Sequence, residues 1–233
     1  MRTRILLRSA AIMAVLVLPC AAGDSFSDFM DDLPPLLEGL PEPPPVDESL
    51  FDELEDDDPE TYVFISDAKA HPPKAVNLGG DGRLTLARPD RHETVTVVYR
   101  RKDGSYDQAA IKRIQRIMRS NGGDGETPPA ELLLEILDRV EDRFGGRGLT
   151  LLSGYRTPKY NRKGPGAARY SLHMLGWAAD IRAPGRTARQ VAAFARGLGA
   201  GGVGYYPDAA FVHLDAGRPR YWTVRGTAGR AGN

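Results

Sequence analysis

Hydrophobic and polar residues alternate along several short stretches of the chain, and each stretch predicts a strand. Residues 93–100, ETVTVVYR, alternate as a half-buried strand does, and the RKDGSY that follows supplies an Asp-Gly turn. Leu84 and Leu86 predict a neighbouring strand. Two more short strands are expected at 149–153, LTLLS, and at 210–216, AFVHLDA.

Apolar residues recur at helical spacing in three other stretches. Residues 107–118 and 128–144 each predict an amphipathic helix, with Pro128 and Pro129 suited to the start of the second. Thr187 is expected to cap a third helix. The apolar faces contain Ile111, Ile114, Ile117 and Met118, then Leu132, Leu133, Ile136, Leu137 and Val140, then Val191, Phe194, Ala195 and Leu198. The order of elements predicts an α+β domain, with a small antiparallel sheet and packed helices, rather than a βαβ series.

The first 23 residues have the pattern of a secretory signal peptide. MRTRILLRS is basic, AAIMAVLVLP is apolar, and CAAG supplies small residues for cleavage near Ala22 or Gly23. The apolar run is shorter than the roughly 20 residues that span a bilayer, so a permanent membrane helix is disfavoured. Pro19 disfavours lipid attachment at Cys20. The exported chain would then contain no cysteine, which excludes disulfides, thiolate zinc sites and cysteine catalysis.

Charge divides the chain unevenly, although its formal net charge is zero. Residues 24–60 contain fifteen acidic residues and seven prolines but no Lys or Arg, which predicts a disordered, self-repelling linker. Residues 61–233 contain 28 basic and 16 acidic residues. We expect a folded domain over 61–225 and a flexible tail over 226–233. A basic domain favours anionic partners, but no zinc-finger spacing or Arg/aromatic pattern indicates nucleic acid.

Two histidines and one aspartate stand out in apolar surroundings. Strand alternation puts His213 and Asp215 on one face of 210–216, and it puts Asp180 on one face of WAADIR, 177–182. His173, Asp180 and His213 together form a ligand set that suits zinc and leaves a fourth position for water. From spacing alone, a second interpretation stays open: His173 and Asp180 form a buried hydrogen-bonded pair, and His213 is an ordinary core residue.

Four motifs resemble one family of zinc peptidases. SGYRTPKYN, SLHMLGWAADIR, GGVGYY and FVHLDAGRPRYW are similar to the D-alanyl-D-alanine dipeptidases and carboxypeptidases that share their fold with the Hedgehog signalling domain, and most similar to the murein endopeptidase K-like branch. The resemblance covers roughly 84–222. It implies a Hedgehog/D-Ala-D-Ala-peptidase-like fold, one Zn²⁺ held by His173, Asp180 and His213, and an Arg156 directed at the substrate or at the developing oxyanion. A surface salt bridge or a loop clamp is the structural alternative for Arg156.

The general base is the point at which the sequence departs from this family. Many relatives have a glutamate three residues before the last histidine, where this chain has Ala210. Asp215, on the same strand face as His213, is the nearest candidate for the catalytic base. Its alternative role is to orient His213 as a hydrogen-bond partner.

Other polar and aromatic residues have two interpretations each. Tyr155, Ser171 and Trp222 are candidates for substrate binding, but Tyr155 also suits packing, Ser171 the end of a loop, and Trp222 closure of the core. The basic loop 162–169 either contacts anionic wall polymer or is solvated. His71 and His92 lie outside the motifs and are expected to be solvated.

Signal, charge and resemblance together favour an exported zinc metallopeptidase of the periplasm or cell envelope. Its expected reaction is hydrolysis of the peptide cross-links of peptidoglycan, with stem peptides and cross-links as partners, no nucleic acid, and no stable membrane span after signal cleavage. A D,D- or L,D-carboxypeptidase that trims stem peptides is one alternative. A non-catalytic, zinc-containing module that binds the cell wall is the other.

Overall fold

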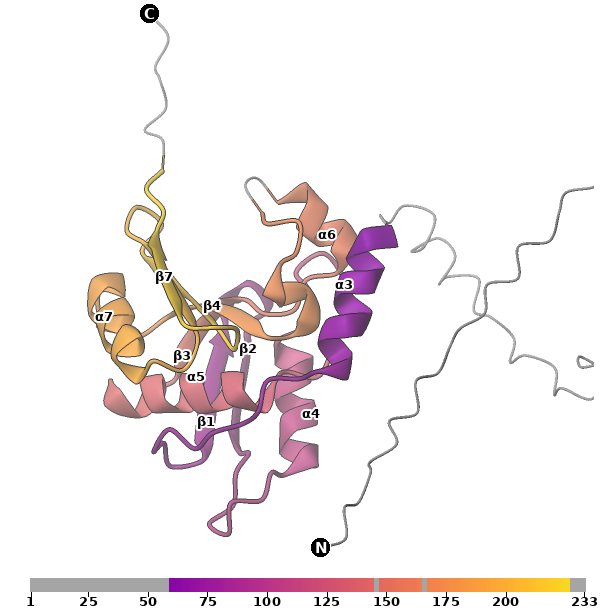
Figure 1. The fold of residues 1–233 in the computed structure, drawn as a ribbon. Coiled ribbons are helices and arrows are strands. Elements are labelled where there is room, and N and C mark those ends of the chain that lie inside the picture. The colour runs from indigo at the N-terminus through magenta and orange to yellow at the C-terminus, as the bar shows by residue number, and fades with distance from the viewer. Residues whose placement is uncertain (1–58, 145–146, 165–166, 227–233) are drawn as a thin grey trace, which may run out of the picture. The chain divides into compact units, whose positions relative to one another are not determined.

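A seven-stranded sheet runs through the folded part of the chain (Figure 1). The computed structural model describes residues 59–144, 147–164 and 167–226. The strand order is β2-β1-β3-β4-β6-β5-β7, with β1 paired to β3 and β5 paired to β7 in parallel and the other neighbours antiparallel. The strands are β1 (Arg83–Arg88), β2 (Glu93–Val98), β3 (Leu149–Ser153), β4 (Ala178–Arg182), β5 (Gly202–Tyr206), β6 (Phe211–Asp215) and β7 (Arg220–Thr223). The α+β class is confirmed, but the sheet is larger than expected and only mostly antiparallel.

Three amphipathic helices cover one face of this sheet. They are α4 (Gln108–Ile117), α5 (Glu131–Arg143) and α7 (Ala188–Leu198), and their apolar sides join the sheet in one buried core. In Figure 1, α7 and α4 lie on either side of α5. None of the helices in the described residues is long and apolar enough to cross a bilayer.

The helix ends follow the local chemistry of the sequence. Asp107 caps α4 by accepting hydrogen bonds from two backbone N–H groups, and Thr187 forms a capping box with Gln190 at the start of α7. Helix α5 begins at Glu131 rather than at 128: Pro129 disfavours helical backbone at Pro128, and Ala130, the N-cap residue, is extended. The N–H of Ala130, just before α5, donates to the carbonyl of Gly176 (3.2 Å). This bond ties α5 to the loop that follows His173.

Several elements carry no strong periodic pattern and were not predicted. They are α3 (Pro59–Ala70), α6 (Pro158–Lys163) inside an expected polar loop, the short 3-10 helices η1 (Pro89–Arg91) and η2 (Leu172–Leu175), and strands β5 and β7. Helix α3 starts two residues before the expected start of the folded domain. The predicted signal peptide, the linker up to residue 58 and the tail from 227 onward lie outside the described residues.

The alternation predicted for the two central strands is confirmed. Val212 and Leu214 of β6 lie in the helix-covered core, as do Ala179 and Ile181 of β4. The intervening side chains therefore point to the other face of the sheet. Antiparallel pairing of β4 with β6 puts Asp180 directly opposite His213. The uncovered face of the sheet thus carries the polar residues that the sequence singled out.

Candidate metal centre

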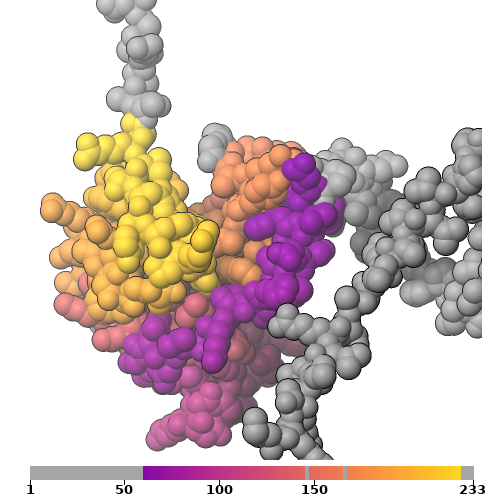
Figure 2. All heavy atoms as spheres, in the orientation of Figure 1, coloured from indigo at the N-terminus to yellow at the C-terminus, as the bar shows by residue number. Residues whose placement is uncertain are grey.

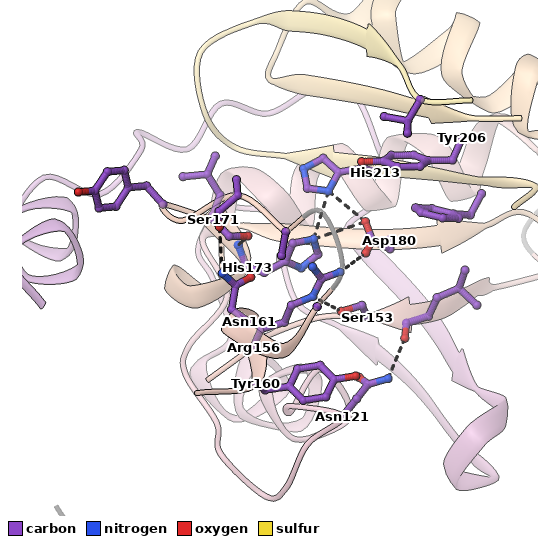
Figure 3. A pocket seen from close by; sticks show the side chains of 18 of the residues that line it. Asn121, Ser153, Arg156, Tyr160, Asn161, Ser171, His173, Asp180, Tyr206 and His213 are labelled. Atoms are coloured by element: carbon purple, nitrogen blue, oxygen red, sulfur yellow. Dashed lines mark hydrogen bonds and ion pairs between the residues drawn. The ribbon is translucent and has the colours of Figure 1, made fainter. Parts of the chain in front are cut away.

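Three donor atoms from three different elements meet above β4 and β6 (Figure 3). His173 comes from η2, Asp180 from β4 and His213 from β6. Nε2 of His173 lies 3.1 Å from Nδ1 of His213, and Oδ1 of Asp180 lies 3.4 and 3.0 Å from these two nitrogens. The structure therefore brings the three predicted ligand residues together, and His213 is not an isolated core residue.

The size of this triangle fits a tetrahedral metal ion. A tetrahedral ion bound at about 2.0–2.1 Å by nitrogen and oxygen separates its ligand atoms by roughly 3.3–3.4 Å. The three observed separations, 3.0 to 3.4 Å, match this spacing closely. A carboxylate and two imidazoles are also donors that bind such ions. The residues present therefore fit a metal centre with three protein ligands.

Hydrogen bonds behind His173 determine which of its nitrogens faces the cluster. Nδ1 lies 2.6 Å from the carbonyl oxygen of Gly154, which can only accept, so Nδ1 carries the proton and Nε2 presents its lone pair. Ser171 caps η2, with its Oγ 3.4 Å from the N–H of His173, and Gly176 ends η2 in the left-handed region. Ser171 is thus a loop-ending residue that orients His173, and it also borders the cavity.

Asp215 contacts the ring nitrogen of His213 that points away from the cluster. Its Oδ2 accepts a hydrogen bond from Nε2 of His213 (3.0 Å), which leaves Nδ1 facing the cluster. Arg220 donates to both carboxylate oxygens (2.8 and 3.0 Å), and the N–H groups of Gly202 and Gly217 donate to Oδ1. Asp215 is fully buried and is absent from the described cavity lining. Asp215 is thus placed to orient the ring of His213.

Arg156 contacts the aspartate of the cluster. Its Nη2 donates to Oδ2 of Asp180, and its Nε donates to the hydroxyl of Ser153 (2.8 Å). Oδ2 is thereby engaged, and Oδ1 is the oxygen that faces the two histidines. Arg156 also borders the cavity. It is therefore placed both to hold Asp180 and to contact a substrate.

Burial and mutual contacts shift the pKa values of all three residues of the cluster. Burial lowers the pKa of His173. Burial would raise the pKa of Asp180, but the charges and hydrogen bonds of the two histidines outweigh burial and hold that pKa below its ordinary value. For His213, burial is outweighed by hydrogen bonds to Asp180 and Asp215, so its pKa is raised. The two aspartates on either side of His213 thus favour its protonated form.

A cavity of about 880 Å³ opens at the cluster. Figure 2 shows the surface hollowed between the yellow C-terminal strand and the orange segment around α6. His173, Asp180 and His213 lie in its lining, and Asp180 is the only carboxylate among the described lining residues. The other lining residues include Asn121, Ser153, Tyr160, Asn161, Lys163, Tyr170, Tyr206, Phe211, Arg220 and Trp222. The cluster thus has access to a space large enough for a peptide segment.

Some of the remaining candidate residues line the cavity and others do not. Trp222 is half-buried in the cavity wall, with its ring centroid 5.3 Å from that of His213, whereas Tyr155 is absent from the described lining. His71 and His92 are exposed, as predicted. Ala210 lines a separate hollow beside Arg182 and does not face the metal cluster's cavity. Ala210 has left-handed backbone and precedes the strand, which therefore begins at Phe211, one residue later than expected.

Sequence reasoning missed several lining residues. Asn121, Tyr160, Asn161 and Tyr206 come from loops, α6 and β5, whose positions depend on tertiary packing. Tyr206 had a signal: strand alternation from Val203 and Tyr205, which pack in or against the core, places it on the open face. In Figure 3 its hydroxyl points toward His213.

Gly204 controls the position of Trp222. It pairs with His213 on one side and with Trp222 on the other, and a Cβ at Gly204 would lie 2.6 Å from the indole ring. We expect Gly204→Ala to displace the indole and change its fluorescence maximum. The measurement uses a Trp177→Phe background, because the chain has two tryptophans. Gly197→Ala, at a helix position with open space, is the matched control, and an unchanged spectrum for Gly204→Ala would contradict the packing.

Two histidines and a carboxylate that converge beside a cavity are the donor set that zinc peptidases use. Residues 80–222 match the family model described as peptidoglycan L,D-endopeptidase MepK, and the chain belongs to this family of M15 peptidases. The resemblance seen in the four motifs is thereby confirmed.

Individual relatives cover part of the chain. The probable peptidoglycan L,D-endopeptidase MepK of Haemophilus influenzae is 30% identical over 123 residues, which is 50% of this chain and 66% of the relative. The peptidoglycan L,D-endopeptidase MepK of Escherichia coli K12 is 37% identical over 95 residues, 39% of this chain and 52% of the relative. The aligned region thus spans less than two thirds of each relative. No solved structure matches the chain.

Proposed function

We propose that the protein is an exported zinc metallopeptidase that hydrolyses peptide cross-links of peptidoglycan in the periplasm or cell envelope. The observation that carries this proposal is the triangle of His173, Asp180 and His213 at the floor of a cavity. Membership of the MepK family supports peptidoglycan as substrate. It also supports a fold of the Hedgehog/D-Ala-D-Ala-peptidase type. The predicted signal sequence and the basic charge of 61–233 are consistent with an exported enzyme acting on an anionic wall.

Zn²⁺ is the ion that this donor set suits best. His173 Nε2, His213 Nδ1 and Asp180 Oδ1 would hold it, with the fourth position facing the cavity. Bound zinc would lower the pKa of its water toward neutrality and polarise the carbonyl of the scissile peptide. Ca²⁺ and Mg²⁺ prefer all-oxygen sites, which two imidazoles do not provide.

The surrounding residues would keep the ligands in one orientation. Asp215 accepts a hydrogen bond from Nε2 of His213, and the carbonyl of Gly154 accepts one from Nδ1 of His173. Arg156 donates to Oδ2 of Asp180. Such outer contacts fix the tautomer and orientation of metal ligands. We therefore propose that Asp215 orients His213 rather than serving as the base. We place Ser171, Arg156 and Trp222 at the substrate cavity and omit Tyr155, because it lies outside the described lining.

Digestion of purified sacculi tests the reaction. The chain without its predicted signal peptide, loaded with zinc, should convert cross-linked muropeptides to uncross-linked ones, as read by mass spectrometry. Release of terminal residues without loss of cross-links would show a carboxypeptidase instead. Zinc binding and co-sedimentation with sacculi, but no product, would show a wall-binding module. Either of these results would overturn the proposed endopeptidase.

Substitution of Arg156 tests its contact with Asp180. We expect Arg156→Gln to weaken zinc affinity by about 10–100-fold, because Oδ2 of Asp180 loses its charged partner. Competition with a chelator of known affinity measures this. Arg113→Gln, at an exposed site on α4, is the control. If Arg156→Gln binds zinc normally but has a raised KM, then Arg156 contacts substrate and is not a clamp.

A further inference from the structure

A second group of carboxylates lies outside the cavity, where the loop before β1 meets α5. One oxygen from each of Asp81, Asp138 and Asp142 lies within 4.8 Å of the others. Asp138 and Asp142 are four residues apart on α5 and so share one face of the helix. The loop approaches α5 closely here, because a Cβ at Gly80 would collide with the carboxylate of Asp138.

Each carboxylate uses one oxygen to accept backbone N–H groups and leaves the other without a hydrogen bond. Asp81 Oδ1 accepts from the N–H of Arg83 (2.7 Å), and Asp142 Oδ2 accepts from the N–H of Asp81 (2.9 Å). Asp138 Oδ2 accepts from the N–H of Gly82 (3.0 Å). Among the described residues, no hydrogen-bond donor contacts Asp81 Oδ2, Asp142 Oδ1 or Asp138 Oδ1. These contacts hold the three side chains in place while leaving three oxygens available.

The unpartnered oxygen of Asp138 is the observation that points to a ligand. Asp138 is fully buried, and a buried carboxylate oxygen without a partner is costly. The nearest cation is Arg100, whose Nη2 is 3.7 Å from Oδ2, and this guanidinium already donates to Glu135 and to the Gly80 carbonyl. Burial raises the pKa of Asp138 to about 6, so the group is mostly ionised at neutral pH.

The spacing and chemistry of the three carboxylates suit a hard divalent cation. Ca²⁺ binds oxygen at about 2.3–2.6 Å, so two ligand oxygens on opposite sides of the ion are roughly 4.6–5.2 Å apart. Three carboxylate oxygens within 4.8 Å of one another fall inside this limit. The group contains no histidine or cysteine, unlike the cluster in the cavity, so the two sites would select different ions.

We propose that Asp81, Asp138 and Asp142 form a Ca²⁺ site that ties the loop before β1 to α5. The ion would bridge an exposed loop to a buried helix face and supply the missing partner of Asp138 Oδ1. The role of the ion is to stabilise the fold. This proposal therefore goes beyond the proposed peptidase reaction and does not depend on it.

Thermal unfolding of the full chain tests this site. With one equivalent of Zn²⁺ present and ionic strength held constant, Ca²⁺ at ten times its dissociation constant should raise Tm by about 3–5 °C in a protein of this size. Asp142→Asn should lose most of this rise. It keeps an oxygen for the N–H of Asp81 but removes one negative charge from the site. Asp67→Asn, the same change at an exposed position of α3, should retain the rise.

Terbium luminescence gives a second, local readout. Tb³⁺ replaces Ca²⁺ at oxygen sites, and the hydroxyl of Tyr99 lies 2.8 Å from Asp138 Oδ2, close enough to sensitise a bound lanthanide. Emission excited through tyrosine should appear in wild type, fall on addition of Ca²⁺, and be weak in Asp142→Asn. Equal Ca²⁺ responses in wild type and Asp142→Asn would place the ion elsewhere, as in the acidic segment 24–60, and would overturn the proposal. An unchanged wild-type Tm together with no Tyr-sensitised emission would do the same.

Discussion

His173→Ala is expected to lose bound zinc and to cut peptidoglycan at least 10³-fold more slowly than wild type. A catalytic zinc contributes several kcal/mol of transition-state stabilisation, and each 1.4 kcal/mol is tenfold in rate. Nε2 of His173 is one of three donor atoms, so its removal opens the triangle on one side. Zinc content by mass spectrometry and product release from sacculi measure the two losses.

The fold should survive this substitution with reduced stability. His173 is nearly fully buried, and its loss leaves the carbonyl of Gly154 without its hydrogen bond, at a cost of about 1–3 kcal/mol. Circular dichroism and thermal unfolding separate this effect from loss of the metal. His71→Ala, at an exposed site, should behave as wild type. A His173→Ala protein that keeps its zinc and its activity would remove the basis of the proposed mechanism.

Asp215→Asn is expected to lower zinc affinity by about 10–100-fold and stability by about 1–3 kcal/mol. Asparagine has nearly the same shape, but its amide cannot accept on both sides from His213 Nε2, Arg220 and two backbone N–H groups. The imidazole of His213 then loses its fixed orientation. Arg220, which is half-exposed, can turn to solvent and limits the loss of stability.

Excess zinc distinguishes the two roles open to Asp215. If the residue orients His213, saturating zinc should restore a large part of the activity of Asp215→Asn. If it is the base, the variant should hold zinc with normal affinity and stay inactive at any zinc concentration. Chelator competition run beside sacculus digestion reads both quantities on the same sample. Asp103→Asn, at an exposed turn, controls for the change of charge.

The strand faces were predictable because the period of a strand is two and one side of this sheet is buried. Val212 and Leu214 identify the core side of β6, so His213 and Asp215 had to share the other side. The same rule places Asp180 on the open face of β4. The approach of His173 was not predictable by this rule, since it depends on η2 and on a backbone carbonyl, Gly154, nineteen positions earlier.

The elements that surround the cavity, α6 and β7, were less predictable than the strands β4 and β6 that carry the cluster. Helix α6 has six residues, mostly polar, and depends on the Thr157 cap and on Pro158 rather than on an apolar face. Strand β7 was read only as an aromatic RYW segment, because its pairing with β5 is a long-range contact. The contact of Arg156 with Asp180 likewise joins positions 24 residues apart. Such contacts leave no periodic trace in the sequence.

The direct pairing of Asp180 with His213 across β4 and β6 makes this centre a test of correct folding. A slip of one residue between these strands would turn one of the two side chains toward the helices, and the donor atoms would no longer converge. Misfolded chains with the same composition and nearly the same sheet would therefore be inert. If the proposed hydrolysis of the cell wall is correct, activity would appear only in molecules whose central strands are aligned.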